Sequence, residues 1–233
     1  MEIGASAWRQ IVQAGSLEMG AEVTGFQMDQ LALHSAELIR WNRKTNLTAI
    51  TTPEEIAVKH VLDAMAPLPH LPASGTLLDI GSGGGFPGVV LKILRPDLSA
   101  TLIDASRKKV SFLSHVIRTL GLKDISALQA RAEALAGEPP YAHRFDVIVS
   151  RALCALDAFV AMALPLLAPD GLLIAFKGRP EEAEAEIAIV PAYAKSTVTN
   201  KTSEDRGLAI SSVIYRLPRL NIERTLVLIR VTD

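Results

Sequence analysis

Five glycines fall within the ten residues Asp79-Ile80-Gly81-Ser82-Gly83-Gly84-Gly85-Phe86-Pro87-Gly88. They follow the apolar run Thr76–Ile80 and precede the apolar segment Val89–Leu94, so the pattern predicts a buried strand, a tight turn and a helix. Glycines at such a turn let backbone N–H groups approach a ligand, and the start of a helix favours negative charge. The loop alone is also compatible with a plain strand–helix turn, and Gly83-x-Gly85-x-x-Gly88 fits a dinucleotide fingerprint by its spacing.

Two acidic residues near this loop narrow the choice of ligand. Asp79 stands two residues before the first glycine, where a buried strand would favour an apolar residue, and Asp104 ends the next predicted strand, Ala100–Ile103. An acid at that place can accept hydrogen bonds from both ribose hydroxyls. Asp79 would repel a pyrophosphate, which disfavours a nicotinamide dinucleotide. The spacing is typical of enzymes that use S-adenosyl-L-methionine, in which the first acid meets the methionine ammonium group, usually through water.

Strands and helices alternate along the chain from Gly75 onward. Further strands are predicted at Ile125–Leu128, Phe145–Val149 and Leu172–Phe176. Two late runs, Leu208–Leu217 and Arg224–Val231, have no helical pattern between them and predict an antiparallel pair at the sheet edge. The alternation predicts an α/β fold of the class I methyltransferase type, with a doubly wound, mostly parallel sheet.

Residues 1–74 are predicted to form a helical N-terminal extension, and residues 75–233 the S-adenosylmethionine-binding domain. Thr24 followed by Gln27 resembles a capping box, and Thr52-Pro53-Glu54-Glu55 is typical of a helix start. Apolar residues at helical spacing predict a further helix over Leu156–Leu167. The first 25 residues lack the pattern of a secretory signal, and no apolar segment approaches the roughly 20 residues of a membrane span, so we expect a soluble cytoplasmic protein.

Composition limits the partners and the chemistry. Of the 233 residues 49% are hydrophobic, and the formal charge is −1, which disfavours broad electrostatic coating of nucleic acid but leaves a local basic patch possible. The extension has 5 basic and 8 acidic residues, and the remainder has 19 basic and 17 acidic. The single cysteine, Cys154, cannot form an internal disulfide or a cysteine-rich zinc site, and no metal is expected.

The residues after the fourth predicted strand restrict the atom that is methylated. Enzymes that methylate exocyclic amines carry an Asp/Asn-Pro-Pro-aromatic motif there, whereas this chain has Ser150-Arg151-Ala152-Leu153. Methylation of pyrimidine C5 needs a cysteine nucleophile, and RNA enzymes of that kind use two, whereas Cys154 is alone. Atoms that are already nucleophilic remain, such as guanine N7, a sulfur or a carboxylate.

An ordered set of short motifs extends on both sides of the glycine loop. Before it stand Trp41-Asn42, Asn46-Leu47-Thr48 and His60-Val61-Leu62-Asp63; after it come Asp104, Arg131-Ala132-Glu133, Ser150-Arg151-Ala152 and Lys177-Gly178. From about Phe26 to the C-terminus the chain thereby resembles the bacterial glucose-inhibited division protein B family. Lys59 and Ala64 depart from the family, which usually has arginine and serine there.

This resemblance implies a function and a partner. The family methylates guanine N7 in small-subunit (16S) ribosomal RNA, so the expected substrate is one position of that RNA, within the small ribosomal subunit or a precursor. Guanine N7 has a lone pair and no proton, so we expect direct in-line transfer with no general base and no covalent enzyme intermediate. The target base must leave its stack to reach the pocket.

Candidate site residues follow from both lines of reasoning. The loop and its acids predict cofactor contacts at Asp79, Gly81, Gly83, Gly85 and Asp104, and the resemblance adds Phe86, Ala132, Glu133 and Arg151. Candidates for positioning the substrate are Asn46, His60, Asp63, Arg151 and Lys177.

Several of these residues have a structural alternative. His60 and Asp63 are three residues apart on one helix face, and the pair could equally tie the extension to the sheet domain. Trp41 either stacks on a base or packs in the core. Arg107, Lys108 and Lys109 either contact phosphate or are solvated charges. Three other functions also remain open: a class I methyltransferase of a small molecule or protein, a nicotinamide-dependent oxidoreductase, and a non-enzymatic cofactor-binding regulator.

Overall fold

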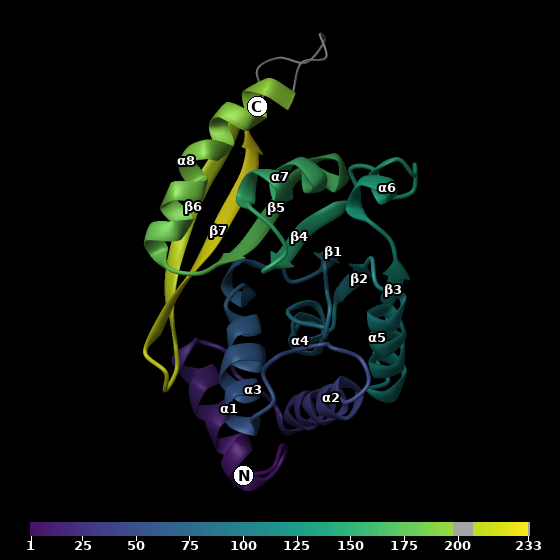
Figure 1. Cartoon of the computed structure of the whole chain (residues 1–233), viewed down its shortest axis with the longest axis vertical. Coiled ribbons are helices and arrows are strands. Elements are labelled where there is room, and N and C mark those ends of the chain that lie inside the picture. The colour runs from purple at the N-terminus through teal and green to yellow at the C-terminus, as the bar shows by residue number, and fades with distance from the viewer. Residues whose placement is uncertain (198–206, 233) are drawn as a thin grey trace.

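A seven-stranded sheet forms the centre of the molecule in the computed structural model, which describes residues 1–197 and 207–232. The spatial order of its strands is β3-β2-β1-β4-β5-β7-β6. The parallel strands are β1 (Gly75–Ile80), β2 (Leu98–Asp104), β3 (Ile125–Gln129), β4 (Phe145–Arg151) and β5 (Leu167–Lys177). Helices cover both faces (Figure 1). The predicted doubly wound, mostly parallel sheet is confirmed.

The strand order sets the position of the ligand site. The chain runs from β1 outward to β2 and β3, then returns to β4 on the other side of β1. In open parallel sheets, this reversal leaves a crevice at the carboxyl ends of the two strands that flank the switch. The glycine loop leaves the end of β1, so the fold places it at this crevice.

One face of the sheet is covered by α4 (Gly88–Leu94) and α5 (Arg107–Thr119), with α1 (Ser6–Glu18) and α2 (Gly25–Asn42) packed beyond them. The predicted capping box begins α2: Thr24 Oγ1 accepts the Gln27 N–H, and Gln27 Oε1 accepts the Thr24 N–H. Phe112 of α5 is fully buried and lies 5.7 Å, centroid to centroid, from the Trp41 ring. The helices of residues 1–74 therefore share a hydrophobic core with the sheet, and their treatment as a separate extension remains a prediction.

The helix that starts after Thr52 changes its backbone form along its length. It begins as α3 (Pro53–Ile56), continues as a π-helix, η1 (Ala57–Leu62), and tightens into the 3₁₀ turn η2 (Asp63–Met65); a further 3₁₀ turn, η3 (Leu68–His70), follows. Thr52 caps it as predicted, with Oγ1 accepting the Glu55 N–H. π-Helical segments are rare and often occur at functional sites. Here the π segment carries His60, and Asp63 follows it directly.

The opposite face is covered by α6 (Ala132–Ala136), α7 (Leu156–Ala163) and α8 (Pro180–Thr197). The predicted extension of α7 to Leu167 is wrong. The α-helix ends at Ala163, a 3₁₀ turn, η4, covers Leu164–Leu166, and Leu167 already begins β5. Pro165 explains the difference, because proline has no N–H for an α-helical hydrogen bond and clashes with the preceding turn.

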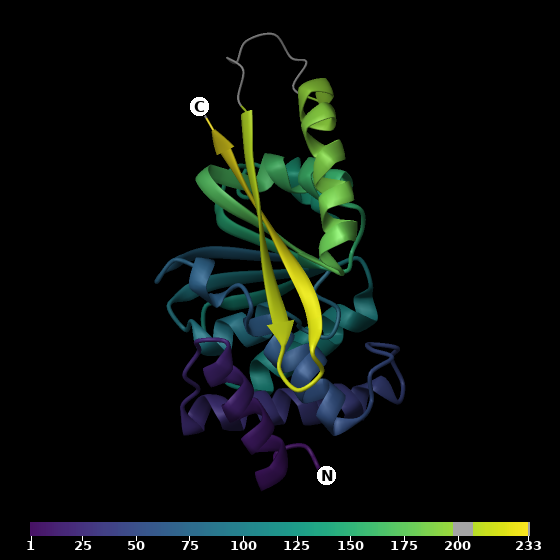
Figure 2. The same cartoon turned by 90° about the vertical axis from the view of Figure 1, so that its left-hand side faces the viewer.

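The two late strands form the predicted antiparallel pair. β7 (Ile222–Thr232) pairs with β5, and β6 (Gly207–Leu217) pairs with β7 at the sheet edge. Figure 2 shows this hairpin crossing the molecule down to the N-terminal helices. There Arg219 Nη2 lies 3.2 Å from Glu54 Oε1, and the Tyr215 hydroxyl donates to Asp63 Oδ1 at 2.6 Å. Among the described helices, none is both long and apolar enough to cross a bilayer.

Replacing Phe112 with alanine should lower the free energy of unfolding by about 3–5 kcal/mol, because the change leaves a cavity between the sheet and α2. Urea unfolding followed by circular dichroism measures this loss. Leu17→Ala is the matched control: its side chain is 55% exposed, so we expect a change of about 0.5 kcal/mol or less. Equal losses in the two variants would contradict a shared core.

Candidate functional site

A cavity of about 470 Å³ opens at the carboxyl ends of β1, β2 and β4. Its walls come from two parts of the chain. One end is lined by the glycine loop, Asp104, Ala132, Glu133 and Met162. The other end is lined by Leu38, Leu47, Thr48, His60, Arg151 and Leu153. The first end is lined by most of the residues predicted to contact the cofactor. The second is lined by residues of the N-terminal segment together with residues at and just after the end of β4.

The glycine loop needs glycine for its backbone conformation. Gly81, Gly83 and Gly85 have φ values of 76°, 52° and 84°, a region that disfavours side chains. Gly88 meets a different constraint, because a Cβ there would lie 2.4 Å from Leu102 Cδ2 and 2.6 Å from Asp79 Oδ2. The loop therefore turns sharply and lets α4 start in direct contact with the sheet. Gly81 and Gly83 line the cavity, whereas Gly85 does not.

Asp79 lies beneath the loop rather than in the cavity wall. It is fully buried, and its Oδ2 accepts the Gly88 N–H at 2.9 Å, while Oδ1 has no partner among the described residues. Burial raises the pKa of Asp79 to about 6, and the hydrogen bond from Gly88 opposes that rise. Sequence reasoning assigned Asp79 to the cofactor's ammonium group; in the structure its visible contact is to the start of α4.

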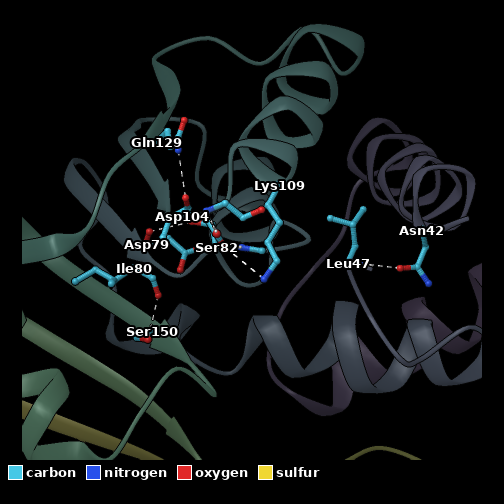
Figure 3. A network of polar contacts seen from close by, with 12 residues as sticks. Asn42, Leu47, Asp79, Ile80, Ser82, Asp104, Lys109, Gln129 and Ser150 are labelled. Carbon is cyan, nitrogen blue, oxygen red and sulfur yellow. Dashed lines mark hydrogen bonds and ion pairs between the residues drawn. The ribbon is translucent and has the colours of Figure 1, made fainter. Parts of the chain in front are cut away.

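Asp104 ends β2 and does line the cavity (Figure 3). Its Oδ2 accepts the Gly83 N–H at 3.1 Å, and its Oδ1 accepts the Ser106 N–H at 2.8 Å. Lys109 Nζ lies 3.8 Å from Oδ2 and also lines the cavity. Lys109 is therefore part of the site wall, a position that the basic cluster in the sequence did not suggest.

Phe86 of the glycine loop stacks with two histidines from the N-terminal helices. Its ring centroid lies 4.6 Å from that of His34 and 4.7 Å from that of His60. Burial lowers the pKa of His34 to about 4, and burial together with the Arg151 charge lowers the pKa of His60 to about 3. Both imidazoles are therefore neutral at pH 7. His34 Nε2 lies 2.8 Å from the Gly84 carbonyl, which can only accept, so Nε2 carries the proton.

Arg151 connects β4 to the helix that carries His60 and Asp63. Its Nη1 donates to the Lys59 carbonyl at 3.0 Å and to Asp63 Oδ2 at 3.1 Å. Its Nη2 lies 2.9 Å from His60 Nδ1, which accepts because a guanidinium can only donate. These contacts tie the N-terminal helices to the sheet, as in the structural alternative for the His60–Asp63 pair. His60 and Arg151 nevertheless also line the cavity.

Asn42 holds the loop that forms the far wall. Its Oδ1 accepts the N–H groups of Leu47 and Thr48 at 2.8 and 3.0 Å, and its Nδ2 donates to the Thr48 carbonyl. Figure 3 shows the hydrogen bond between Leu47 and the Asn42 side chain. Thr48 Oγ1 in turn lies 2.8 Å from His60 Nε2. Asn46, the residue predicted from the motif, is exposed and does not line the cavity.

Asp63 and Lys177 lie in a second cavity of about 390 Å³, which shares His60, Arg151 and Ala152 with the first. Lys177 Nζ donates to the Cys154 carbonyl at 3.0 Å and to Glu186 Oε2 at 2.7 Å. The structure therefore brings together four of the five predicted substrate residues, with Asn46 set apart. The residues that sequence reasoning missed are His34, Leu38, Leu47, Thr48, Lys109 and Leu153.

Trp41 fits its structural interpretation, and Cys154 lacks the features of a nucleophile. The Cys154 side chain is partly buried at the cavity wall, and burial raises the pKa of its thiol, opposed by the Lys177 charge. A raised pKa disfavours the thiolate that nucleophilic attack requires. Trp41 packs against Phe112 and His115 instead of lining the cavity. Within residues 1–197 and 207–232, no three His, Cys, Asp or Glu side chains cluster as metal ligands would.

The sequence is similar to one protein family over most of its length. The family model described as GidB, rRNA small subunit methyltransferase G, matches residues 27–205. A ribosomal RNA small subunit methyltransferase G from Geobacter sp. (strain M21) is 47% identical over 178 residues, which are 76% of this chain and 81% of the relative. The protein of that name from Geotalea uraniireducens is 41% identical over 97% of this chain and 98% of the relative.

Solved structures resemble the fold at much lower identity. A SAM-dependent methyltransferase from Aquifex aeolicus aligns with a TM-score of 0.54 and 15% identity, covering 84% of this chain and 98% of that chain. Trm5b from Pyrococcus abyssi aligns with a TM-score of 0.56 and 11% identity, over 79% of this chain and 51% of that chain. These alignments support the class I methyltransferase fold.

Replacing His34 with phenylalanine should change how stability depends on pH. The pKa of His34 is lowered from 6.5 to about 4 in the folded protein, so between these pH values the unfolded chain binds a proton that the native state does not. The contribution of His34 to the free energy of unfolding therefore decreases as the pH falls through this range, by about 1.4 kcal/mol per pH unit. The phenylalanine variant should lose that contribution to the slope.

The measurement is urea unfolding of both proteins between pH 7.5 and pH 5. Asp79, whose pKa is raised to about 6, gives a slope of opposite sign between about pH 4 and 6, but it is present in both proteins. The difference in the free energy of unfolding between wild type and His34→Phe therefore reports the titration of His34 alone. As the pH falls, the variant should become more stable relative to wild type. A difference that stays constant with pH would show that His34 titrates normally.

Proposed function

This chain belongs to the GidB family, described as rRNA small subunit methyltransferase G, and we propose that it transfers a methyl group from S-adenosyl-L-methionine to N7 of a guanine in 16S ribosomal RNA. The observation that carries this proposal is the family match over residues 27–205. Family membership also makes the chain an S-adenosylmethionine-dependent enzyme. The oxidoreductase and non-enzymatic alternatives are therefore set aside.

The cavity end next to the glycine loop fits the cofactor. Asp104 lies at the cavity wall with its carboxylate held by the N–H groups of Gly83 and Ser106. A carboxylate at the end of the second strand suits the two hydroxyls of a ribose. Ala132 and Glu133 begin α6 beside it, where a backbone N–H and a side chain can contact an adenine. Gly81, Gly83 and Phe86 would line the methionine end.

Asp79 would act on the cofactor through the loop. Its Oδ2 accepts the Gly88 N–H. Its buried Oδ1 has no partner among the described residues, and such an acceptor is suited to a hydrogen bond from a bound ligand or water. Gly85 would contribute in the same indirect way, since its φ of 84° shapes the turn without lining the cavity. We assign both residues to loop conformation, next to the cofactor.

The other cavity end would receive the guanine. Thr48, His60 and Arg151 offer polar groups there, and Leu38, Leu47 and Leu153 offer apolar contacts. Asp63 and Lys177 would act from the adjoining cavity, where Asp63 holds Arg151 and Lys177 holds the Cys154 carbonyl. Asn46 is exposed on the loop beside Leu47, a position suited to contacting RNA outside the cavity.

The chemistry requires little from ionisable groups. When bound, S-adenosyl-L-methionine supplies a methyl group on a sulfonium; the N7 lone pair forms the new C–N bond, and the electrons of the broken S–C bond stay on the departing thioether. No proton is removed from N7, so the neutral His60 is not required as a base. The protein's contribution is alignment, which can supply about 7–11 kcal/mol of the barrier.

The biological setting is part of the same proposal. The RNA would be methylated within the small ribosomal subunit or a precursor, in the cytoplasm, and without a metal. A tritiated-methyl assay on purified small subunits, naked 16S RNA and total protein tests it. We expect label in the RNA at guanine N7. Label in protein or small molecules alone would favour the alternative function, a class I methyltransferase that acts on a small molecule or a protein.

Replacing Asp104 with alanine should weaken S-adenosyl-L-methionine binding about 10-fold to 100-fold, because a hydrogen bond to a charged group contributes about 1.5–3 kcal/mol. Isothermal titration calorimetry measures the affinity. Asp97→Ala is the control, since Asp97 is exposed just before the opposite end of β2. Unchanged affinity in Asp104→Ala would refute the ribose assignment.

Replacing Cys154 with alanine should leave the rate of methyl transfer within about threefold of wild type, because its thiol has a raised pKa and no nucleophile is needed. Single-turnover methylation of small subunits measures the rate. Loss of turnover in a variant that unfolds at the wild-type urea concentration would revive a covalent mechanism.

A further inference from the structure

Leu153 is an apolar side chain exposed at the mouth of the site. It is 44% exposed, while the apolar residues of β4 before it are almost fully buried. It lines the main cavity and packs on the glycine loop, where a Cβ on Gly81 would lie 2.8 Å from Leu153 Cδ1. An exposed leucine is common on protein surfaces, but one at the edge of a ligand cavity is available to cover a flat apolar ligand.

The backbone before Leu153 is strained. Ala152 has a φ of 52°, in the left-handed region that residues with a Cβ rarely adopt. Such conformations persist where the surroundings enforce them, and they cluster at functional sites. Among the described residues, the other non-glycine positions with positive φ are Asp124, His143, Asp170, Arg219 and Asn221, and none of them lines this cavity. Ala152 does line it.

Buried contacts hold the strained turn on both sides. Before it, Arg151 is bound to Asp63 and to the Lys59 carbonyl. After it, Lys177 Nζ donates to the Cys154 carbonyl, and Glu186 Oε2 accepts the Leu156 N–H at 2.6 Å. Lys177 Nζ and Glu186 Oε2 also form an ion pair with each other at 2.7 Å. These contacts fix the turn, and the turn fixes the position of Leu153 at the cavity wall, against Gly81.

We propose that Leu153 packs against one face of the target guanine and helps hold that base outside its RNA stack. The inference rests on the proposed function, since it names a contact with that substrate. A flipped purine loses the stacking on its faces, and apolar or aromatic protein groups replace it. Thr48, His60 and Arg151 offer polar groups to the edge of the ring, and Leu153 offers an exposed apolar surface that would cover its face.

Leu153→Ala tests this contact with little risk to the fold, because the side chain is half exposed. We expect kcat/KM for methylation of unmethylated small subunits to fall about tenfold or more, with S-adenosyl-L-methionine affinity within twofold of wild type and an unchanged urea midpoint. Leu153→Phe, which keeps an apolar face, should retain activity within about threefold. Leu17→Ala, another exposed leucine, should behave as wild type.

Each other outcome has a definite meaning. Wild-type activity in Leu153→Ala would overturn the inference while leaving the proposed function intact. Weakened cofactor affinity in that variant would also overturn it, because Leu153 would then belong to the methionine end of the cavity. A wild-type protein that binds S-adenosyl-L-methionine but methylates no small-subunit RNA would refute the proposed function itself, and the inference with it.

Discussion

The hydrogen bonds of the partly buried Arg151 guanidinium are the interaction on which the geometry of the site depends. It stands at the end of β4 and donates to Asp63 and to the Lys59 carbonyl, while His60 accepts from its other nitrogen. A charge that is withdrawn from water needs a counter-charge and hydrogen-bond partners. Removing Asp63 would take away the carboxylate paired with Arg151, and removing His60 would leave one guanidinium N–H without its acceptor. The helix that carries His60 and Asp63 thus holds the Arg151 side chain in place at the end of β4.

The helix that carries His60 and the separate helix α2, which carries His34, both reach the glycine loop through aromatic contacts. Phe86 stacks with His60 and with His34, and His34 donates to the Gly84 carbonyl within the loop. His60 lies in the π-helical segment η1 and contacts both Phe86 and Arg151. The C-terminal hairpin adds a third contact, from the Tyr215 hydroxyl to Asp63. Segments far apart in sequence therefore converge on one carboxylate and one guanidinium.

Sequence reasoning predicted the fold well because the fold depends on local and periodic patterns. The strand–loop–helix at Asp79–Gly88, the cap at Thr24 and the late antiparallel pair each follow from nearby residues. It failed at Leu164–Leu167, where apolar spacing favoured a helix and Pro165 ended it.

The site was predicted less completely, because its distances are set by long-range packing. Asn46 and Asn42 look alike in the motif, yet only Asn42 turns its side chain into the loop that holds Leu47 and Thr48. His34 gave a faint signal, as a polar residue within the apolar stripe of α2. Leu153 gave no signal, because its position depends on the positive φ of Ala152 and on the hydrogen bonds that hold the neighbouring residues.

The charge of the protein is consistent with this arrangement. Methylation at N7 gives the purine a positive charge, which unpaired cations nearby would oppose. Around the cavity end proposed for the guanine and the adjoining cavity, Arg151 is paired with Asp63, Lys177 with Glu186, and Lys59 with Glu55. Both buried histidines are neutral, because their pKa values are about 4 and 3. The near-zero net charge of the chain thus has a local counterpart: each of these three cations is paired with a carboxylate, which reduces the positive charge that a methylated purine would meet there.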